Sequence, residues 1–310
     1  MGSRTCLKNW VGLSALILLS ASPVSAQLES QLSSYTGRNA PGYLKPLVDA
    51  LGADLYAGLY HSARIPERGL EIALEMTFMS ARFSEADKTF IAVTENGFQP
   101  EQSTEASTVV GPREAVYVDG DSGTRFAFPG GFDLRSFDFA VPQLRVGSLY
   151  GTEALVRFGL MYSGDADLGD FRLYGLGIRH SVSQYFNGLP VDVAVGVAWQ
   201  RFSLGKNERG GSLVSAQAWT VSLQTSRRFS RLEPYVGVAY DDFGLDLSYQ
   251  GDSTADRIEM SLESEDHFHM TAGLSVKMGF TTLNGEYNIG GQDAFALGLA
   301  VGYPSFSAGE

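Results

Sequence analysis

The stretch that decides the fold is Asp293-Ala-Phe-Ala-Leu-Gly-Leu-Ala-Val-Gly-Tyr303, near the end of the chain. Successive side chains of an extended strand point to opposite faces of the sheet. One face here carries Phe295, Leu297 and Leu299, whereas the other carries only alanine and glycine. A half-exposed strand of a soluble sheet usually pairs an apolar face with a charged one. The pattern is instead typical of a transmembrane β-barrel strand, whose large residues face lipid and whose small residues face the lumen.

The same alternation recurs through the second half of the chain. Repeating segments of nearly this length are what a tilted strand needs to cross a bilayer, and glycine-rich turn signals such as Asn187-Gly188 and Gly290-Gly291 separate them. The sequence therefore predicts an all-β fold, a transmembrane antiparallel β-barrel of about 14 strands (12–14) over residues 66–306. The alternative is a soluble β-sandwich. The predicted strands lie at residues 70–78, 154–162, 174–179, 191–200, 219–224, 235–241, 243–249, 270–278, 283–289 and 293–303.

Residues 1–26 have the pattern of a secretory signal peptide. Arg4 and Lys8 precede a short apolar run, and Val24-Ser25-Ala26 forms a small-residue cleavage site. An exported barrel is expected in the outer membrane of a Gram-negative (diderm) bacterium, with outer-membrane lipid as its partner. Cys6 is the one cysteine of the chain, so the mature protein would have no disulfide, zinc–thiolate site or cysteine nucleophile.

The charge of the chain argues against a nucleic-acid partner. The formal net charge is −12, and removal of Arg4 and Lys8 with the signal peptide gives −12 − 2 = −14 for the mature chain. Phosphate contacts require basic patches, which a chain this acidic does not favour.

Residues 27–65 follow a different period from the rest. Leu44, Leu47, Leu51 and Leu55 recur at helical spacing, which predicts an amphipathic helix over roughly 41–57, with Pro46 near its first turn. This segment is interpreted as a short N-terminal helical plug, or hatch, at the barrel mouth. The alternative is a linker helix on the periplasmic rim. Residues 95–140 are irregular and are interpreted as a long loop, a second plug segment or an irregular hairpin, with strand-like pieces at 114–118 and 124–128.

Several motifs resemble an uncharacterised family of bacterial outer-membrane β-barrel proteins. They include Pro41-Gly42-Tyr43-Leu44 and lie at residues 41–47, 51–55, 58–63, 129–134, 141–147 and 174–180. The resemblance covers most of the mature chain and implies a barrel, but it brings no assigned activity. More distantly, the layout is similar to the long-chain fatty-acid transporter type of barrel, with an N-terminal plug before about fourteen strands.

Two groups of residues were weighed as metal ligands. His267 and His269, beside Glu263, Glu265 and Asp266, would share one face of a strand and could share a metal ion. Clustered carboxylates at Asp165, Asp167 and Asp170 suit calcium. A polar strand end and an ordinary acidic loop are the favoured interpretations, so no metal site is predicted.

Charged residues are also expected on the lumen wall. Glu71 and Glu75 lie on the predicted lumen face, and Arg157, Arg172, Arg179 and Arg201 could pair with such acids across the lumen, either plugging it or lining a pore. No nucleophile elbow or phosphate-binding glycine loop is found.

The predicted function is a passive channel or transporter for small or hydrophobic molecules, with a small hydrophobic ligand as a further partner. A sealed structural or adhesion barrel is the first alternative, and an outer-membrane barrel hydrolase is the second. The sequence predicts no catalytic residue and no cofactor.

Overall fold

The computed structural model describes residues 38–95, 97–161, 171–205, 214–250, 257–264 and 266–306. The predicted signal peptide at 1–26 and the first part of the predicted plug, 27–37, lie outside these residues. Within them, no helix combines the length and the apolar character needed to cross a bilayer.

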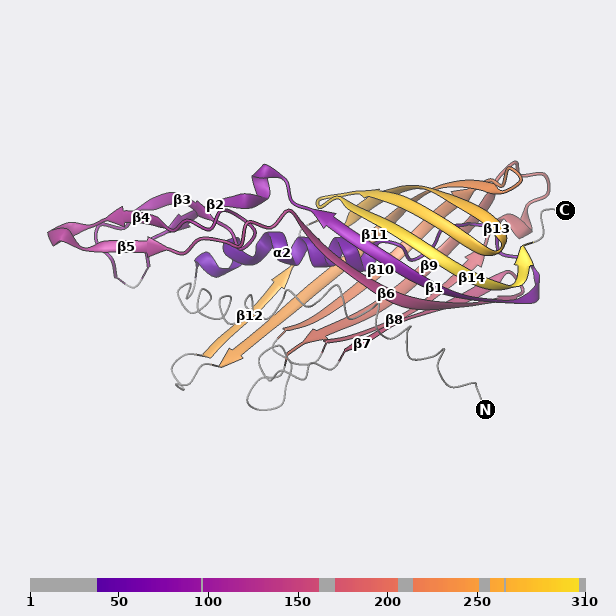
Figure 1. Ribbon diagram of the computed structural model, residues 1–310, viewed down its shortest axis with the longest axis horizontal. Helices are drawn as coiled ribbons and strands as arrows, with labels where there is room; N and C mark the ends of the chain where they lie inside the picture. Colours follow the sequence, from indigo (N-terminus) through magenta and orange to yellow (C-terminus); the bar gives the residue numbers. More distant parts are fainter. Residues whose placement is uncertain are drawn as a thin grey trace, which may run out of the picture.

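The main body of the molecule is a closed antiparallel β-barrel (Figure 1). Pairing of β1 with β14 and of β10 with β11 closes the ring, and β12 (Arg257–Glu263) pairs with β11 beside β13. An all-β barrel is therefore confirmed. The ring consists of β1 (Arg68–Arg82), β6 (Ser136–Leu149), β7 (Thr152–Met161), β8 (Phe171–Ser181), β9 (Asp192–Leu204), β10 (Val214–Ser226), β11 (Leu232–Gln250), β13 (Phe268–Ile289) and β14 (Ala294–Phe306).

The strand β13 folds back on itself. It has 22 residues, which at ~3.3 Å per residue would be far longer than the ~30 Å hydrocarbon layer. Gly279 has a φ of 64°, residues before it pair with β11, and residues after it pair with β14. The Thr271 hydroxyl, on the arm before the turn, donates to the Asn288 side chain, on the arm after it. An antiparallel ring needs an even number of strands, and the two arms of β13 supply it.

The predicted strand number of about 14 is not confirmed. Nine labelled strands and β12 account for the described sheet. One excess strand came from reading 235–241 and 243–249 as separate, whereas both belong to β11. Alternation continues through Asp241 and Asp242, so Phe243 and Leu245 fall on the inner face and are buried, while Val238 points outward.

The two faces of the barrel match the predicted lipid and lumen faces. In β1, Leu74 is 55% exposed and the neighbouring Glu75 is 1% exposed. In β14, Leu299 is 51% exposed and Ala300 is 2% exposed. Exposed apolar side chains of this kind continue around the ring, and a barrel in a bilayer would present them to the acyl chains. They include Ile72, Val156, Leu176, Val195, Val221, Val236, Leu274, Leu283 and Val301.

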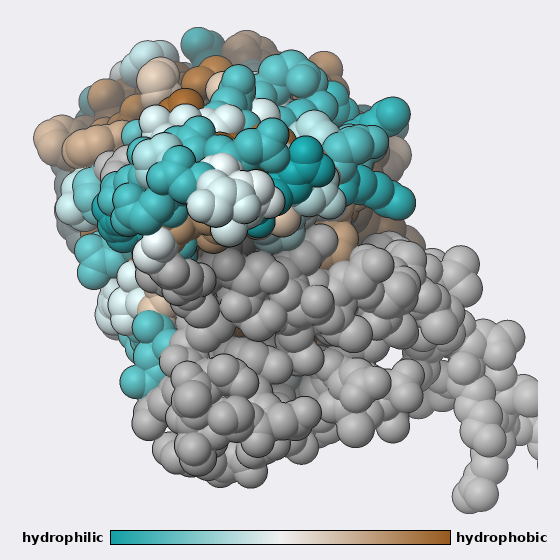
Figure 2. Space-filling model, turned by 90° about the vertical axis from the view of Figure 1, so that its left-hand side faces the viewer, coloured by the Kyte–Doolittle hydropathy of each residue, from teal (hydrophilic) through white to brown (hydrophobic). Residues whose placement is uncertain are grey.

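Residues 83–135 project from one end of the barrel, which we call the hairpin end (Figure 1). They form two small sheets, so of the three interpretations of 95–140 the hairpin is confirmed. The opposite end, the turn end, carries the tight turns after β6 and at Gly279. Figure 2 shows that much of the hairpin end is hydrophilic, with hydrophobic residues at its edges. The elements are η1 (Glu85–Lys88), β2 (Thr89–Val93), β3 (Ser103–Ser107), β4 (Val116–Asp119), η2 (Asp121–Gly123) and β5 (Arg125–Phe128), with η3 (Ser183–Tyr185) at the turn end.

The helix α2 (Asn39–Tyr56) begins against the projecting hairpins and ends inside the barrel mouth. At its start, the Asn39 amide and side chain both donate to Glu95, so a carboxylate lies at the positive end of the helix dipole. Pro46 lies in the helix interior rather than near its first turn. Further along, the helix packs on an apolar part of the inner wall that includes Leu173, Phe202 and Phe243.

Candidate functional site: the charged lumen and the segment that fills it

We call the half of the lumen nearer the turn end the turn half, and the other half the hairpin half. Residues 57–65 fill the turn half, continuing from α2 in extended form and leading into β1. They are not a strand of the barrel sheet. Instead, wall side chains bond to their backbone: Gln143 donates to the Gly58 carbonyl at 3.0 Å, the Gly58 amide donates to Glu286 at 2.6 Å, and the Ala63 amide donates to Ser226 at 2.9 Å. The segment can therefore leave without breaking a strand pair.

Arg157 is the main anchor for the end of the helix. It is fully buried on β7, and its guanidinium donates to the carbonyl of Leu55 at 3.1 Å and to that of Ala57 at 3.0 Å. Its other contacts are the side-chain oxygens of Gln143, at 2.9 Å, and Gln200, at 3.3 Å. Hydrogen bonds from a charged donor are stronger than neutral ones, so one wall residue fixes the C-terminal turn of α2.

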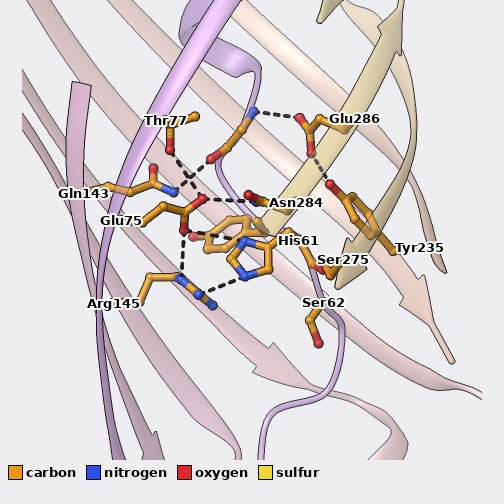
Figure 3. A network of polar contacts seen from close by, with 12 residues as sticks. His61, Ser62, Glu75, Thr77, Gln143, Arg145, Tyr235, Ser275, Asn284 and Glu286 are labelled. Carbon is orange, nitrogen blue, oxygen red and sulfur yellow. Dashed lines mark hydrogen bonds and ion pairs between the residues drawn. The ribbon is translucent and has the colours of Figure 1, made fainter. Parts of the chain in front are cut away.

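His61 lies at the centre of the polar network (Figure 3). Its Nε2 faces the Arg145 guanidinium at 2.9 Å, so Nε2 is the acceptor and the ring is neutral, with its proton on Nδ1. Nδ1 lies 3.5 Å from a carboxylate oxygen of Glu75. Asn284 donates to the other oxygen of Glu75 at 3.0 Å, and the His61 carbonyl accepts from Ser275 at 2.7 Å.

A second cluster holds the following turn of the segment. Arg179 pairs with Glu153 at 2.9 Å and donates to the Ser62 carbonyl. The Ser62 hydroxyl donates to Glu233, which also pairs with Lys277 at 2.8 Å. Charged side chains of the wall therefore bind the carbonyl and the hydroxyl of Ser62.

In the turn half of the lumen, the buried charges of the wall balance one another; Asp241, a further buried acid, lies in the hairpin half beside Tyr56. The acids are Glu75, Glu153, Glu233 and Glu286, and the bases are Arg145, Arg157, Arg179 and Lys277. Buried ion pairs contribute little net stability compared with apolar packing. The hairpin half of the same lumen is packed with apolar side chains, so the charged half is not needed merely to fill the barrel.

One acid of the helix has no partner in this arrangement. Asp54 is fully buried, and neither carboxylate oxygen receives a hydrogen bond. Burial, and then the charge of Asp138, raise the pKa of Asp54 well above its usual value, although Arg157 opposes the shift. Burial therefore favours the neutral form of Asp54, because an unpaired buried charge would be costly.

Glycines of the small inner face make room for this filling. A Cβ on Gly177 would lie 2.4 Å from the hydroxyl of Tyr60. A Cβ on Gly298, within residues 293–303 of β14, would lie 2.1 Å from side-chain oxygens of Glu75 and Asn284. The bare face is therefore covered by the side chains of other elements.

The predicted lumen charges are partly confirmed. Glu75, Arg157 and Arg179 face the lumen, and Glu71 lies half-buried on the same face. Arg172 and Arg201 do not: both are exposed on the outer face, because Arg172 has the same parity as the outward Tyr174. The prediction missed the paired wall residues Arg145, Glu153 and Glu233, although alternation from their neighbours would have placed them inward.

The two histidines weighed as a metal pair contact different faces of β11. His269 bonds to the inward carboxylate of Asp241 and stacks on Tyr56, with ring centroids 6.0 Å apart. His267 stacks on the outward Tyr240 at 5.6 Å. Residue 267 precedes β13, so strand alternation does not extend to it. The acidic loop at Asp165, Asp167 and Asp170, like Glu265, lies outside the described residues.

No curated protein matches the chain. Solved structures that resemble it are outer-membrane proteins. OmpTΔL8 of Vibrio cholerae matches at 9% identity and a TM-score of 0.27, over 76% of this chain and 99% of that one. The outer-membrane protease OmpT of Escherichia coli matches at 10% and 0.28, over 76% and 96%. The toluene transporter TbuX of Ralstonia pickettii matches at 8% and 0.23, over 79% and 90%.

Scores of this size establish no common fold, so the barrel assignment depends on the strand pairing itself. The strand number also differs from the fourteen expected of a fatty-acid transporter layout. The family comparison is direct: a family model described as a family of unknown function (DUF6588) matches residues 7–303. The chain belongs to this family of unknown function, DUF6588.

Proposed function

We propose that the protein is an outer-membrane channel that its own N-terminal segment holds closed. Residues 38–65 are the plug in this proposal, and the hairpin end faces the outside, because bacterial barrels have short periplasmic turns and longer external loops. This proposal rests on the contacts that hold residues 57–65 in the lumen. Side chains of the wall make the hydrogen bonds that hold the backbone of these residues, and the wall that they cover is hydrophilic and charge-balanced.

Departure of the plug would expose two kinds of lumen wall. The turn half would offer four acids and four bases to water, as pore linings do. The hairpin half would offer apolar side chains such as Leu173, Phe202 and Phe243. Such a wall suits the passage of small molecules, including hydrophobic ones. A ring of this size is narrower than the 16- to 18-stranded porins that enclose wide aqueous channels, so large solutes would not fit.

A sealed barrel that displays its hairpins is the second candidate. The observation in its favour is the apolar packing of residues 83–135 against α2, through Val109, Val110 and Phe128, which makes the projecting hairpins an organised surface. In that case the plug would be a permanent core. Catalysis forms no part of either proposal.

Deletion of residues 27–65 after the signal peptide separates the two. Purified variant and wild type are reconstituted in planar bilayers, and unboiled samples on a denaturing gel report whether the barrel is folded. The channel proposal expects the deletion to raise ion conductance above the wild-type level. A folded deletion variant with unchanged conductance would support the sealed barrel instead.

A further inference from the structure

We infer that the cleft between α2 and the barrel wall at the hairpin end binds a primary ammonium group, through Asp49, Tyr56 and Asp241. The inference concerns a ligand site of the structure as it stands, with α2 docked in the barrel, and it holds for a channel and for a sealed barrel alike. Its occupant is an alkylammonium ion, of the kind found on a free diamine or on a lysine side chain.

The cleft narrows from an exposed rim to a buried floor. Asp266 and Gly291 lie at the rim and are exposed, whereas Asp241 and Asn288 lie deeper and are 3% and 4% exposed. The last turn of α2 forms one side through Tyr56. The cavity has a volume of about 30 Å³, which exceeds the ~10–15 Å³ needed to hold one water molecule, so a group the size of an ammonium head fits.

Three polar atoms in this cleft have no hydrogen-bond partner among the residues that the structure describes. They are one carboxylate oxygen of Asp49, one of Asp241 and the hydroxyl of Tyr56, and each is buried. The other oxygen of Asp49 pairs with Lys45 at 3.1 Å, and the other oxygen of Asp241 accepts from His269. Buried polar atoms nearly always have a hydrogen-bond partner. Three unpaired atoms on residues that line one cavity therefore indicate that a ligand binds there.

The chemistry of the three atoms selects the occupant. Two ionised carboxylates only accept hydrogen bonds, and an ammonium group offers three donors and no acceptor. Burial raises the pKa of Asp49 and Lys45 opposes this shift, while the negative charges of Asp266 and Asp87 raise the pKa further. A bound cation would offset this burial and negative charge and favour the ionised form of Asp49. A metal ion is not favoured, because within the described residues no three His, Cys, Asp or Glu side chains are placed to hold one.

The rim adds a second point of attraction. A Cβ on Gly291 would lie 1.7 Å from a carboxylate oxygen of Asp266. The absence of a side chain at Gly291 therefore makes room for the Asp266 carboxylate at the rim of the cleft. A ligand with a second positive charge, such as a short diamine, would place that charge near Asp266. Aromatic rings of Tyr56, Phe268 and His269 line the path for its methylene chain.

The test is calorimetric titration of the full-length protein in detergent micelles with 1,5-diaminopentane. We expect saturable binding by the wild type, and at least tenfold weaker binding by tetramethylammonium, which has no N–H donor, and by 1,5-pentanediol, which has no charge. N-acetyl-lysine amide separates the sources: tighter binding than the diamine assigns the site to lysine side chains, and weaker binding assigns it to free diamines.

Two variants and one control locate the site. Asp241→Asn and Tyr56→Phe each remove part of the triad, and binding should weaken at least tenfold and severalfold respectively. Asp242→Asn is the matched control, because Asp242 is the next residue of β11 and is exposed on the outer face. The Tyr56→Phe variant still decides the question if Asp241→Asn does not fold. Absent binding by the wild type, equal binding of tetramethylammonium, or equal weakening by Asp242→Asn would overturn the inference.

Discussion

Replacing Arg157 with methionine tests whether the plug is held by the anchor that the structure assigns. The guanidinium bonds to the carbonyls of Leu55 and Ala57, which belong to the plug, and methionine keeps much of the volume without a donor. Leu55 retains a hydrogen bond from Gln200, whereas the Ala57 carbonyl loses the donor that the structure gives it. The pairing of β7 with β6 and β8 is a backbone ladder, so the barrel itself should still form.

The size of the effect follows from these bonds. A hydrogen bond from a charged donor contributes roughly 1.5–3 kcal/mol, and leaving a buried acceptor without its donor costs about 1–3 kcal/mol. Each 1.4 kcal/mol changes an equilibrium constant about tenfold. The equilibrium between docked and released plug should therefore shift on the order of 10- to 100-fold toward release.

Single-channel recording in planar bilayers measures that shift as the fraction of time spent conducting. Arg201→Met is the matched control, because Arg201 is exposed on the outer face of β9 and the change removes the same charge. The control should behave as wild type. A folded Arg157→Met barrel, shown by its gel mobility before boiling, that conducts no more than the control would refute the assignment of Arg157 as the anchor.

Three further predictions address the plug and the membrane face. Gly177→Leu should raise conductance, because any Cβ there collides with the hydroxyl of Tyr60; unchanged bilayer currents would contradict the close packing. The raised pKa of Asp54 means that the folded state binds this proton more tightly than the unfolded state, so stability should fall as pH rises above the ordinary aspartate value of 3.8. Asp54→Asn should flatten that part of a thermal-unfolding profile, and an identical pH profile for both proteins would count against it. Val195→Arg places a charge on the outer face and should cost about 2–4 kcal/mol of barrel stability without raising conductance, whereas Ala194→Arg, on the inner face, should raise conductance by displacing the plug. Unfolding titrations and bilayer recordings of the pair would contradict the assigned faces if the two effects were reversed.

Alternation along the chain predicted which side chains face outward and which face the lumen. The rule holds for Leu74 and Glu75 on β1 and for Leu299 and Ala300 on β14, because strand geometry alone fixes it. The same rule places Arg172 and Arg201 on the outer face, where both are exposed.

Strand boundaries were harder to predict, because turn chemistry was weak or misleading. Asp241-Asp242 has the composition of a loop but lies within β11, where Asp241 contacts the plug side and Asp242 faces outward. His267 was expected to share a face of one strand with His269, but residues 264, 266 and 267 lie outside the strands.

The polar site could not be assembled from the sequence. Its contacts join residues 57–65 to wall residues such as Glu286, more than two hundred positions away, and no local pattern encodes such a pairing. The sequence indicated that an apolar helical stripe had to be buried. It gave no sign that the extended residues after the helix, which lack periodicity, would be held by the charges of the wall.

The path of the N-terminal segment also constrains the order in which the molecule assembles. Residues 57–65 lie inside the ring and continue directly into β1, whose two edges pair with β6 and β14. Joining β1 to β14 brings residues 72 and 303 together, the kind of distant contact that carries the largest loop-closure cost. If that seam formed first, the N-terminal chain would have to be pulled through a ring already crowded with side chains. Docking of the segment before β1 meets β14 avoids that threading, whereas the strand pairs of the ring include no residue of the segment.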